Sequence, residues 1–372
     1  MSDRKLVYKV TIDEIEPMDA DTLEAARIGG WRVVCKKGDF HAGDTALYFE
    51  IDAALNPYDR RFEFLLERCY KKFNNHGRLF DECIRIRTMK LRGVISQGLL
   101  MKPELFCEVR NKKLGEDCSD VLMVRHYDEV AEKAAYESGS LRASNQKGLF
   151  PAWIPKTDEE RVQNLNDETL TKFKDELLEC TEKEDGTSCT IFYAASKRPD
   201  DPFGVCSRNF ELKDEPSTYW DVAHELKLPE ILVEYCARNN CNIALQGEIT
   251  GPGIGCNRDC FEALTFQVFR IWDIDNQCFL TKQERYNVVS DLGLKHVPVL
   301  GRRAIKEFCA VSGNPDDYNG EPFNPTVARD NILKFAEGKT VRGNEREGVV
   351  FKSNDGKFSF KAVSNKYLMG LK

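Results

Sequence analysis

The chain has 372 residues, of which 41% are hydrophobic and 31% charged, and its formal net charge is −7. At roughly 150 residues per domain, this length predicts two or three domains with a hydrophobic core of ordinary size. The composition excludes collagen-like, low-complexity and membrane-embedded chains, and the negative charge excludes a protein that is polycationic throughout. A nucleic-acid-binding surface must therefore be a local patch.

The first third of the chain, residues 1–125, alternates like short β-strands. We expect strands at residues 6–12, 31–35, 46–51 and 84–92, and glycine-containing turns separate them. In the last of these strands, period-2 alternation places basic residues on one face. Several short strands with glycine turns predict a small β-barrel or sandwich for this domain.

Charge is unevenly distributed within this first domain. Residues 68–92 contain eight basic side chains and two acidic ones, Asp81 and Glu82, and the basic ones are Arg68, Lys71, Lys72, Arg78, Arg85, Arg87, Lys90 and Arg92. One interpretation is a solvated strand face, as in most charge runs. The alternative is a groove on a barrel that follows nucleic-acid phosphates.

Polar residues at 126–149 predict a linker, and a second domain is expected at 150–372. In this second domain the apolar spacing of residues 159–179 indicates a helix, and residues 223–239 indicate a helix interrupted by Pro229. Strands and helices mix up to the C-terminus.

The 14 cysteines are scattered and form no CxxC pair. Cys256 and Cys260 leave a weak zinc site open, but buried or free thiols are the favoured interpretation. Free thiols are typical of a reducing compartment, so we expect an intracellular protein in the cytoplasm, the nucleus or an organelle matrix. No apolar core follows the charged N-terminus and no apolar run reaches about 18 residues, so neither a secretory signal nor a membrane partner is expected.

The most informative segment of the sequence is Lys183-Glu184-Asp185-Gly186, which is followed by a strand-like run. A lysine before a glycine turn is usually a solvated turn residue, and four residues alone carry little weight. The functional alternative is a lysine nucleophile. Since a lysine of ordinary pKa, about 10.4, is protonated at neutral pH, such a nucleophile needs burial, a neighbouring cation or a metal to lower its pKa.

The chain downstream of Lys183 contains the partners that such a lysine requires. In chain order they are Ser207-Arg208, a strand ending near Glu248, an aromatic strand at 266–273, Glu347-Gly348 at the start of a strand, and a lysine-containing strand at 357–367. In this order and spacing the sequence resembles the covalent nucleotidyltransferases, namely ATP-dependent DNA ligases, RNA ligases and mRNA capping enzymes. One such motif is weak, whereas six in order are specific.

Within that superfamily the chain is most similar to the RNA ligases of the Deinococcus and Naegleria type. Residues 154–165 and 360–368 match that family's motifs, and residues 85–100 resemble its N-terminal domain, whereas residues 276–344 match least. The resemblance implies an α+β protein: an OB-like β-barrel first, then a nucleotidyltransferase domain of antiparallel sheets with flanking helices. In DNA ligases and capping enzymes the OB domain follows the catalytic one.

The resemblance also implies a role for each matching residue. Lys183 would attack the α-phosphate of ATP, and Asp185, Glu248 and Glu347 would hold Mg²⁺ or Mn²⁺, hard cations that prefer oxygen ligands. The nucleotide would be bound by Arg161 at the β- and γ-phosphates, Lys361 at the α-phosphate, Arg208 at the ribose or the end phosphate, Phe269 (or Phe266) stacked on adenine and the backbone carbonyl of Glu182 at the adenine amino group.

One lysine assignment stays open at this stage. Many relatives have Lys-x-Lys where this chain has Ser359 and Lys361, so the second lysine could be Lys352, Lys357 or Lys366. Lys366 is included among the expected nucleotide-binding residues.

The sequence therefore predicts an ATP-dependent RNA ligase that seals 5′-phosphate and 3′-hydroxyl ends, at nicks, as a monomer. Its partner would be nicked or duplex RNA, or an RNA/DNA hybrid, contacted by Arg85, Arg87, Lys90 and Arg92 of the first domain. The alternatives are a DNA ligase, a capping-type guanylyltransferase, and a non-catalytic nucleic-acid-binding protein with a degenerate catalytic domain.

Overall fold

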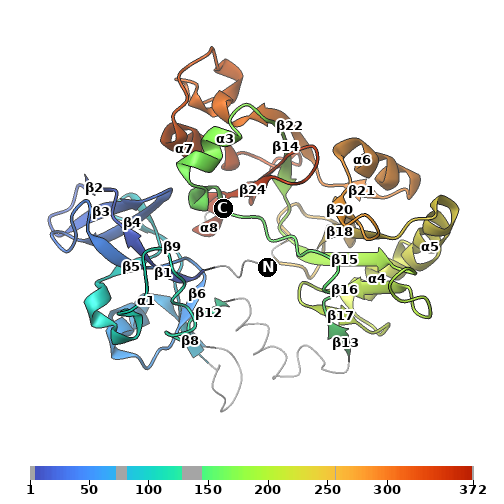
Figure 1. Cartoon of the computed structure of the whole chain (residues 1–372), viewed down its shortest axis with the longest axis horizontal. Coiled ribbons are helices and arrows are strands. Elements are labelled where there is room, and N and C mark those ends of the chain that lie inside the picture. The colour runs from blue at the N-terminus through green and yellow to red at the C-terminus, as the bar shows by residue number, and fades with distance from the viewer. Residues whose placement is uncertain (1–4, 73–81, 128–144, 256, 371–372) are drawn as a thin grey trace. The chain divides into compact units, whose positions relative to one another are not determined.

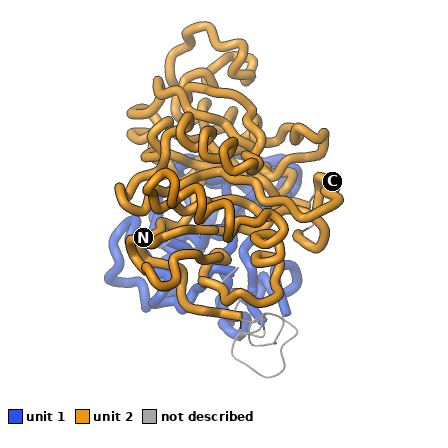
Figure 2. The backbone as a smooth tube through the Cα atoms, turned by 90° about the vertical axis from the view of Figure 1, so that its right-hand side faces the viewer, with its two compact units in different colours: residues 1–143 blue, residues 144–372 orange. Residues whose placement is uncertain are grey.

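The computed structural model describes residues 5–72, 82–127, 145–255 and 257–370. The chain divides into two compact units, residues 1–143 and 144–372, which Figure 2 colours separately. The ends of the expected linker, 126–149, belong to strands of the two units, and residues 128–144 lie outside the described part. The boundary between the units thus falls within the segment that the sequence marks as polar.

The first unit, hereafter unit 1, consists mainly of short antiparallel strands (Figure 1). Its strands are β1 (Val7–Thr11), β2 (Glu14–Pro17), β3 (Leu23–Ile28), β4 (Trp31–Lys36), β5 (Thr45–Phe49), β6 (Ala53–Leu55), β7 (Tyr70–Lys72), β8 (Glu82–Arg85), β9 (Thr88–Leu91), β10 (Val94–Gln97), β11 (Leu99–Met101) and β12 (Arg125–His126). Its short helices are η1 (Arg60–Leu65), α1 (Leu66–Cys69), η2 (Pro103–Leu105) and η3 (Cys107–Val109).

The described strands of unit 1 pair in the orders β1-β5-β11, β2-β3-β4, β9-β10 and β12-β6-β8-β7. The strands expected at residues 6–12, 31–35 and 46–51 correspond to β1, β4 and β5. The single strand expected at residues 84–92 is wrong, because the chain leaves one sheet and enters another there. Ile86 bonds to the backbone of Asp52 and Ala53, so Arg85 ends β8 while Lys90 lies on β9.

The second unit, hereafter unit 2, combines two sheets with helices (Figure 1). Its strands are β13 (Gln146–Leu149), β14 (Leu177–Lys183), β15 (Thr187–Tyr193), β16 (Phe203–Cys206), β17 (Phe210–Leu212), β18 (Ile243–Thr250), β19 (Thr265–Asp273), β20 (Cys278–Phe279), β21 (Lys295–His296), β22 (Val299–Ala304), β23 (Gly348–Lys352) and β24 (Ser359–Val363). Its helices are η5 (Val162–Asn164), α3 (Asp167–Lys172), α4 (Thr218–Glu225), α5 (Leu228–Asn239), α6 (Lys282–Asp291), η6 (Ile305–Cys309), η7 (Pro315–Asp317), α7 (Pro325–Ala336) and α8 (Asn365–Leu368).

Each sheet of unit 2 buries one face under helices. The large sheet runs β13-β17-β16-β15-β18-β19-β20, with β21 parallel to β19, and its core packs against apolar residues of α4, α5 and α6. The small sheet runs β22-β14-β23-β24 and packs against α3, η6 and α7. Side chains alternate across a strand, so the opposite face of each sheet is free to carry polar residues.

Two helix boundaries in unit 2 differ from those expected. The helix expected at 159–179 is wrong: only α3 is α-helical there, capped by the Asn166 side chain, and β14 already begins at Leu177. The break expected at Pro229 lies earlier, at Leu226 and Lys227, because a proline in the first turn of α5 lacks only an N–H that would have no partner within the helix.

Helix α6 is tied to both sheets of unit 2 by a buried polar cluster. The helix begins with a capping box formed by Thr281 and Glu284. Its Arg285 forms a buried ion pair with Glu179 of β14 and donates from Nε to Nε2 of His296 on β21 over 2.9 Å. Burial, and next the Arg285 guanidinium, lower the pKa of His296 to about 4, so the imidazole is neutral in the folded protein at neutral pH.

We expect this histidine to make the protein acid-sensitive. Because the folded-state pKa lies below the ordinary value of about 6.5, the unfolded chain binds the extra proton first, and stability falls as pH decreases from about 6.5 to 4. The wild type should lose about 3 kcal/mol more over this range than His296→Gln. Denaturant unfolding at pH 7, 5.5 and 4 measures the difference, and parallel pH dependence of the two proteins would contradict it.

Candidate active site

Lys183 is the last residue of β14, and the small sheet determines which side chains lie beside it. Glu179, Thr181 and Lys183 share one face of β14, while Leu178 and Cys180 point into the helix-covered core. In register with them on β23 and β24, the same face carries Lys352 opposite both Glu179 and Ser359, and Val350 opposite both Thr181 and Lys361. The alternation of side chains along these strands therefore places three lysines on one face of the small sheet: Lys183, Lys352 and Lys361.

The turn after Lys183 packs directly on the large sheet. A Cβ at Gly186 would lie 2.3 Å from the carbonyl oxygen of Ile249 and 2.7 Å from Cγ of Glu248, so only glycine fits. The same holds at Gly348, where a Cβ would lie 2.3 Å from the carbonyl oxygen of Ala362. These two close approaches explain the glycines that follow Asp185 and Glu347 and bring both carboxylates beside Lys183.

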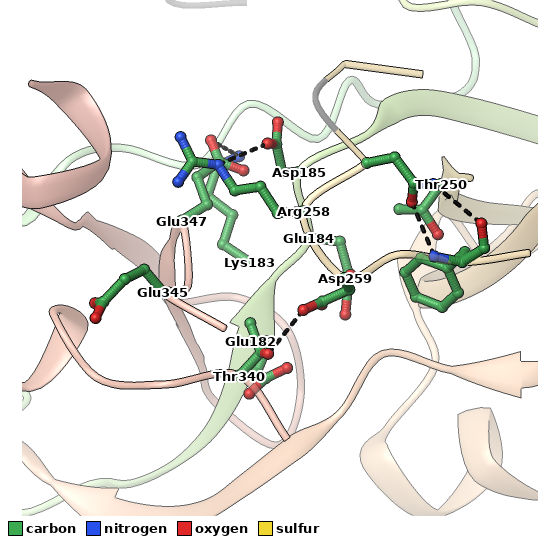
Figure 3. A pocket seen from close by; sticks show the side chains of 12 residues that line it. Glu182, Lys183, Glu184, Asp185, Thr250, Arg258, Asp259, Thr340, Glu345 and Glu347 are labelled. Atoms are coloured by element: carbon green, nitrogen blue, oxygen red, sulfur yellow. Dashed lines mark hydrogen bonds and ion pairs between the residues drawn. The ribbon is translucent and has the colours of Figure 1, made fainter. Parts of the chain in front are cut away.

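Lys183 is held by carboxylates. Its Nζ donates to Oε1 of Glu347 over 2.7 Å, and Figure 3 shows these two side chains together with Asp185. Burial lowers the pKa of Lys183, but the negative charges of Glu347, Glu248 and Asp185 outweigh burial, and the net pKa is raised. Without a further cation, the amine is therefore protonated at neutral pH.

The carboxylates in turn carry more negative charge than the site neutralises. Burial, together with the neighbouring Glu347, Glu184 and Asp185, raises the pKa of Glu248 to about 8 against the opposing effect of Lys183. Burial also raises the pKa of Glu347. Oxygen donors crowded in this way suit a hard divalent cation. Among the described residues, however, no group of three or more Asp, Glu, His or Cys is already arranged around a single metal position.

A pocket opens beside Lys183 (Figure 3). Its lining comes from the end of β14, the loop after β18 and the segment before β23, and consists of Glu182, Lys183, Glu184, Asp185, Thr250, Asn257, Arg258, Asp259, Phe261, Thr340, Glu345 and Glu347. Six of these twelve side chains are carboxylic acids and two are bases, so the pocket is acidic.

Arg161, Lys361 and Arg208 lie on adjoining segments. The backbone of Arg161 forms a parallel bridge with Lys361, next to a 2.7 Å bond from the Lys361 N–H to the Glu160 carbonyl. Arg208, in the turn between β16 and β17, donates to Asp158 over 2.9 Å. Burial alone would raise the pKa of Asp158, but Arg208 and next Lys361 lower it, which shows that both cations lie close to this carboxylate.

The two aromatic candidates on β19, Phe266 and Phe269, differ in their exposure. Phe266 is only 2% exposed and belongs to the core beneath the large sheet, whereas Phe269 is partly exposed on the face that carries no helices. Phe269 is therefore the residue of the two that a ligand can reach.

Glu182 faces the other way from Lys183. Its side chain accepts a 2.8 Å bond from the backbone N–H of Val341, and burial raises its pKa to about 7. The carboxyl group of Glu182 thus fixes the 340–344 segment at the pocket rim, and its side chain does not contact Lys183. Lys366 is exposed on α8, and the neighbouring Tyr367 instead reaches the site.

Sequence reasoning missed Arg258 and Tyr367. The glycine-rich run at 251–255 forms a tight turn, and the loop that continues from it places Arg258 in the pocket. Arg258 Nε lies 3.4 Å from Asp185 Oδ2, its guanidinium stacks on the ring of Tyr367, and the Tyr367 hydroxyl donates to Asp185 Oδ1 over 2.9 Å. The sequence offered one indication of Arg258: its loop directly follows the strand that carries Glu248, which places residues of that loop near the site.

The zinc alternative gains no support. Cys256 lies outside the described residues, and Cys260 is exposed with no metal-binding cluster among the described side chains. The cysteines in the described part of the chain are all free thiols. No helix in that part is long and apolar enough to cross a lipid bilayer.

Comparison with known proteins identifies the family to which this architecture belongs. RNA ligase is the family that matches residues 176–367, just over half of the chain. The chain belongs to the RNA ligase family. An OB-fold domain matches residues 6–103, so the expected α+β fold with an N-terminal OB-like domain is confirmed. No curated protein sequence matches the chain.

Solved structures of an RNA ligase match the whole chain. A mutant of the Naegleria gruberi RNA ligase with AMP and Mn is 33% identical, with a TM-score of 0.79 and 99% of each chain covered. The same enzyme with PPi gives 33% identity, a TM-score of 0.80 and 99% coverage of each chain. Another mutant, with ATP and Mn, gives 33% identity and a TM-score of 0.79, with 98% of this chain and 99% of that chain covered. The family expected from the sequence motifs is confirmed.

The contact between Arg258 and Asp185 yields a prediction about metal binding. Because the guanidinium occupies one side of this carboxylate, we expect Arg258→Gln to bind Mn²⁺ about fivefold more tightly in nucleotide-free protein, the equivalent of ~1 kcal/mol. Isothermal titration of Mn²⁺ measures the change.

Arg342→Gln is the matched control for this titration. Arg342 lies on the ring of Phe261 and donates to the Asp259 carbonyl at the same pocket, so its contacts are with a different part of the lining from Asp185. Unchanged or weaker Mn²⁺ binding by Arg258→Gln would show that the guanidinium does not compete for this carboxylate.

Proposed function

We propose that this member of the RNA ligase family is ATP-dependent and joins a 5′-phosphate to a 3′-hydroxyl through a lysyl-AMP intermediate on Lys183. Its substrate is a nick in duplex RNA or in an RNA/DNA hybrid. The observation that carries the proposal is the 2.7 Å contact between Lys183 and Glu347 in an acidic pocket, on the sheet face that also bears Lys361. The ATP and AMP present with the Naegleria gruberi enzyme support the choice of nucleotide.

In the first step the amine of Lys183 attacks the α-phosphorus of ATP. An N–P bond forms, the bond to the β-phosphate oxygen breaks, and pyrophosphate leaves. Lys361 lies where it can neutralise the α-phosphate, and Arg161, adjacent to it, suits the β- and γ-phosphates because a guanidinium is a fixed, forked donor. Displacement at phosphorus depends chiefly on such positioning and charge stabilisation.

The amine must lose its proton before it attacks. Asp185, Glu248 and Glu347 would hold Mg²⁺ or Mn²⁺, and the bound cation would offset the carboxylate charge that raises the Lys183 pKa and would neutralise the α-phosphate. The proximity of these carboxylates supports this assignment: Asp185, Glu248 and Glu347 all raise the pKa of Lys183. Mn is present with the Naegleria gruberi enzyme.

Adenine would stack on the exposed side of Phe269, and the backbone carbonyl of Glu182 would accept a bond from its amino group. In the second step the 5′-phosphate of the nick attacks the lysyl-AMP, which releases Lys183 and leaves the adenylate on the nucleic acid. In the third step the 3′-hydroxyl attacks that phosphate, forms the phosphodiester and expels AMP. Arg208, partly exposed in the turn between β16 and β17 and paired with Asp158, would hold the end phosphate.

The protein would act as a monomer in a reducing, intracellular compartment. The free thiols of the described residues support that compartment, since extracellular proteins tend to oxidise such cysteines to disulfides. This assignment needs no second chain for the lysine or the carboxylates, because one unit supplies all of them.

We expect purified protein incubated with α-³²P-ATP and Mn²⁺ to retain label after denaturation, and Lys183→Ala to reduce that label to background. The reason is that the label is carried by the Nζ–phosphorus bond. Lys357→Ala is the matched control: this lysine is 84% exposed, pairs with Asp355, and should leave labelling unchanged.

A parallel incubation with α-³²P-GTP separates the alternatives. Label from GTP alone would indicate a capping-type guanylyltransferase. The absence of label from either nucleotide, in folded protein free of bound AMP, would instead indicate a non-catalytic binding protein.

The unit 1 residues expected to contact nucleic acid differ in their surroundings. Arg87, Lys90 and Arg92 are exposed, whereas Arg85 pairs with Asp52 over 2.8 Å and lies on the ring of Tyr127. We therefore assign phosphate contacts to the exposed three and a structural role to Arg85. Residues 73–81, which include Arg78, lie outside the described part.

We expect the double variant Arg87→Glu/Lys90→Glu to slow sealing of a nicked RNA duplex by about tenfold or more at 0.15 M salt, because each lost phosphate contact weakens binding. Self-adenylylation should change less than threefold. Gel-based sealing and labelling assays on the same preparations measure both, and Arg85→Glu serves as the comparison that should lower thermal stability. Equal loss of the two activities in the double variant would contradict a nucleic-acid role.

A further inference from the structure

The three candidates for the second lysine beside Lys361 differ in how far they are buried. Lys357 is exposed and pairs with Asp355, and Lys366 is exposed on α8. Lys352 is only 3% exposed, lies on the same sheet face as Lys183 and Lys361, and stands directly opposite Ser359 in the β23–β24 register. Lys352 is therefore the buried lysine nearest to the position that Ser359 occupies.

The side chain of Lys352 reaches the large sheet at an irregularity in strand β19. Gln246 of β18 pairs with Arg270, and the next residue, Gly247, pairs with Val268, so Phe269 has no partner in the β18 register. This is a β-bulge, and bulges commonly re-aim a side chain near a functional site. The phase of the strand changes across it: Phe266 and Val268 lie in the core before the bulge, and Ile271 lies there after it.

The carbonyl oxygen of the bulged residue is bonded from the other sheet. Lys352 Nζ donates to the Phe269 carbonyl over 2.9 Å and lies 5.8 Å from the centre of the Phe269 ring. The bond crosses from the small sheet to the large one, so it fixes the backbone of Phe269 relative to the face that carries Lys183.

Burying a lysine at this position costs free energy. The guanidinium groups of Arg270 and Arg285 lie nearby, and burial with these two cations lowers the pKa of Lys352 to about 7. The nearby Glu179 and Glu159 are each already paired with an arginine, Glu179 with Arg285 and Glu159 with Arg270. A buried Lys352 amine that donates to the backbone carbonyl of Phe269 under these conditions points to a positional role.

We propose that Lys352 is a positioning residue that holds the bulge at Phe269 and thereby keeps the Phe269 ring turned toward the bound adenine. This inference rests on the proposed function, since it takes Phe269 as the adenine platform. Lys352 acts through the Phe269 backbone and makes no contact with the phosphates. Its loss therefore weakens adenine binding and leaves the chemistry at Lys183 intact.

The test is a double-mutant cycle on AMP binding. Because stacking on an aromatic ring contributes substantially to base binding, we expect Phe269→Ala to raise the Kd for AMP about tenfold. Lys352→Met, which keeps the length of the side chain and removes the donor, should raise it by a similar factor. The double variant should bind AMP no more weakly than Phe269→Ala alone, because the two residues act as one unit.

Kinetics supply a second readout. Lys352→Met should raise the KM for ATP in self-adenylylation about tenfold while kcat changes less than threefold. Lys357→Met, on the same hairpin, is the matched control and should alter neither constant. Thermal unfolding shows whether each variant is folded, and Lys352→Leu, which also lacks the donor, replaces the methionine variant in the cycle if that variant does not fold. Lys352→Gln, which retains an N–H donor, should bind AMP better than the methionine variant.

Two outcomes would overturn the inference. Effects that multiply in the double variant, to about a hundredfold, would place Lys352 in independent contact with the nucleotide. A loss of kcat at saturating ATP would place it in the phosphoryl-transfer chemistry. Failure of the proposed function is distinguishable from both, because it appears as absence of label in the wild type, whereas the AMP-binding cycle needs no catalysis.

Discussion

The contact between Lys183 and Glu347 is the interaction on which the site depends. A nucleophilic amine must be neutral, yet the carboxylates around Lys183 raise its pKa and hold it as an ammonium. Burial, and after it the neighbouring carboxylates, raise the pKa of Glu248 to about 8 against the opposing effect of Lys183. In the proposed reaction, a cation held by these carboxylates would offset their charge and lower the pKa of Lys183, so activation of the nucleophile would depend on occupation of the site.

This arrangement needs two sheets that each bury one face under helices and turn the other toward the pocket. The small sheet contributes Lys183, Lys352 and Lys361 through the period-2 pleat. The large sheet contributes Glu248 and Phe269, and Phe269 is the residue without a β18 partner at the bulge in β19. Gly186 allows the turn after β14 to pack against β18 of the large sheet, and Gly348 allows β23 to lie close to β24 within the small sheet. Packing, pleat and bulge together determine which side chains meet.

Much of the fold of unit 1, and the family, could be predicted from the order of the residues. The short strands of unit 1 follow from alternation and glycine turns, and six motifs in collinear order identify the family that the comparisons confirm. Errors occurred where tertiary contacts override local pattern. Residues 84–92 alternate like one strand, yet Ile86 bonds to Asp52 and Ala53 and the chain changes sheets. The spacing at 159–179 is helical, yet residues from Leu177 onward pair with β22 and β23.

The sequence by itself determined the family and the fold class, because residue type and spacing are properties of the chain. Only the tertiary structure showed that Phe266 is buried and Phe269 partly exposed, because which face of a strand is covered depends on the helices that pack against the sheet. It also separated exposed Lys357 and Lys366 from buried Lys352, and brought Arg258 and Tyr367 against Asp185. These contacts join segments about 70 to 180 residues apart, and local pattern carries no information about which distant side chains will meet.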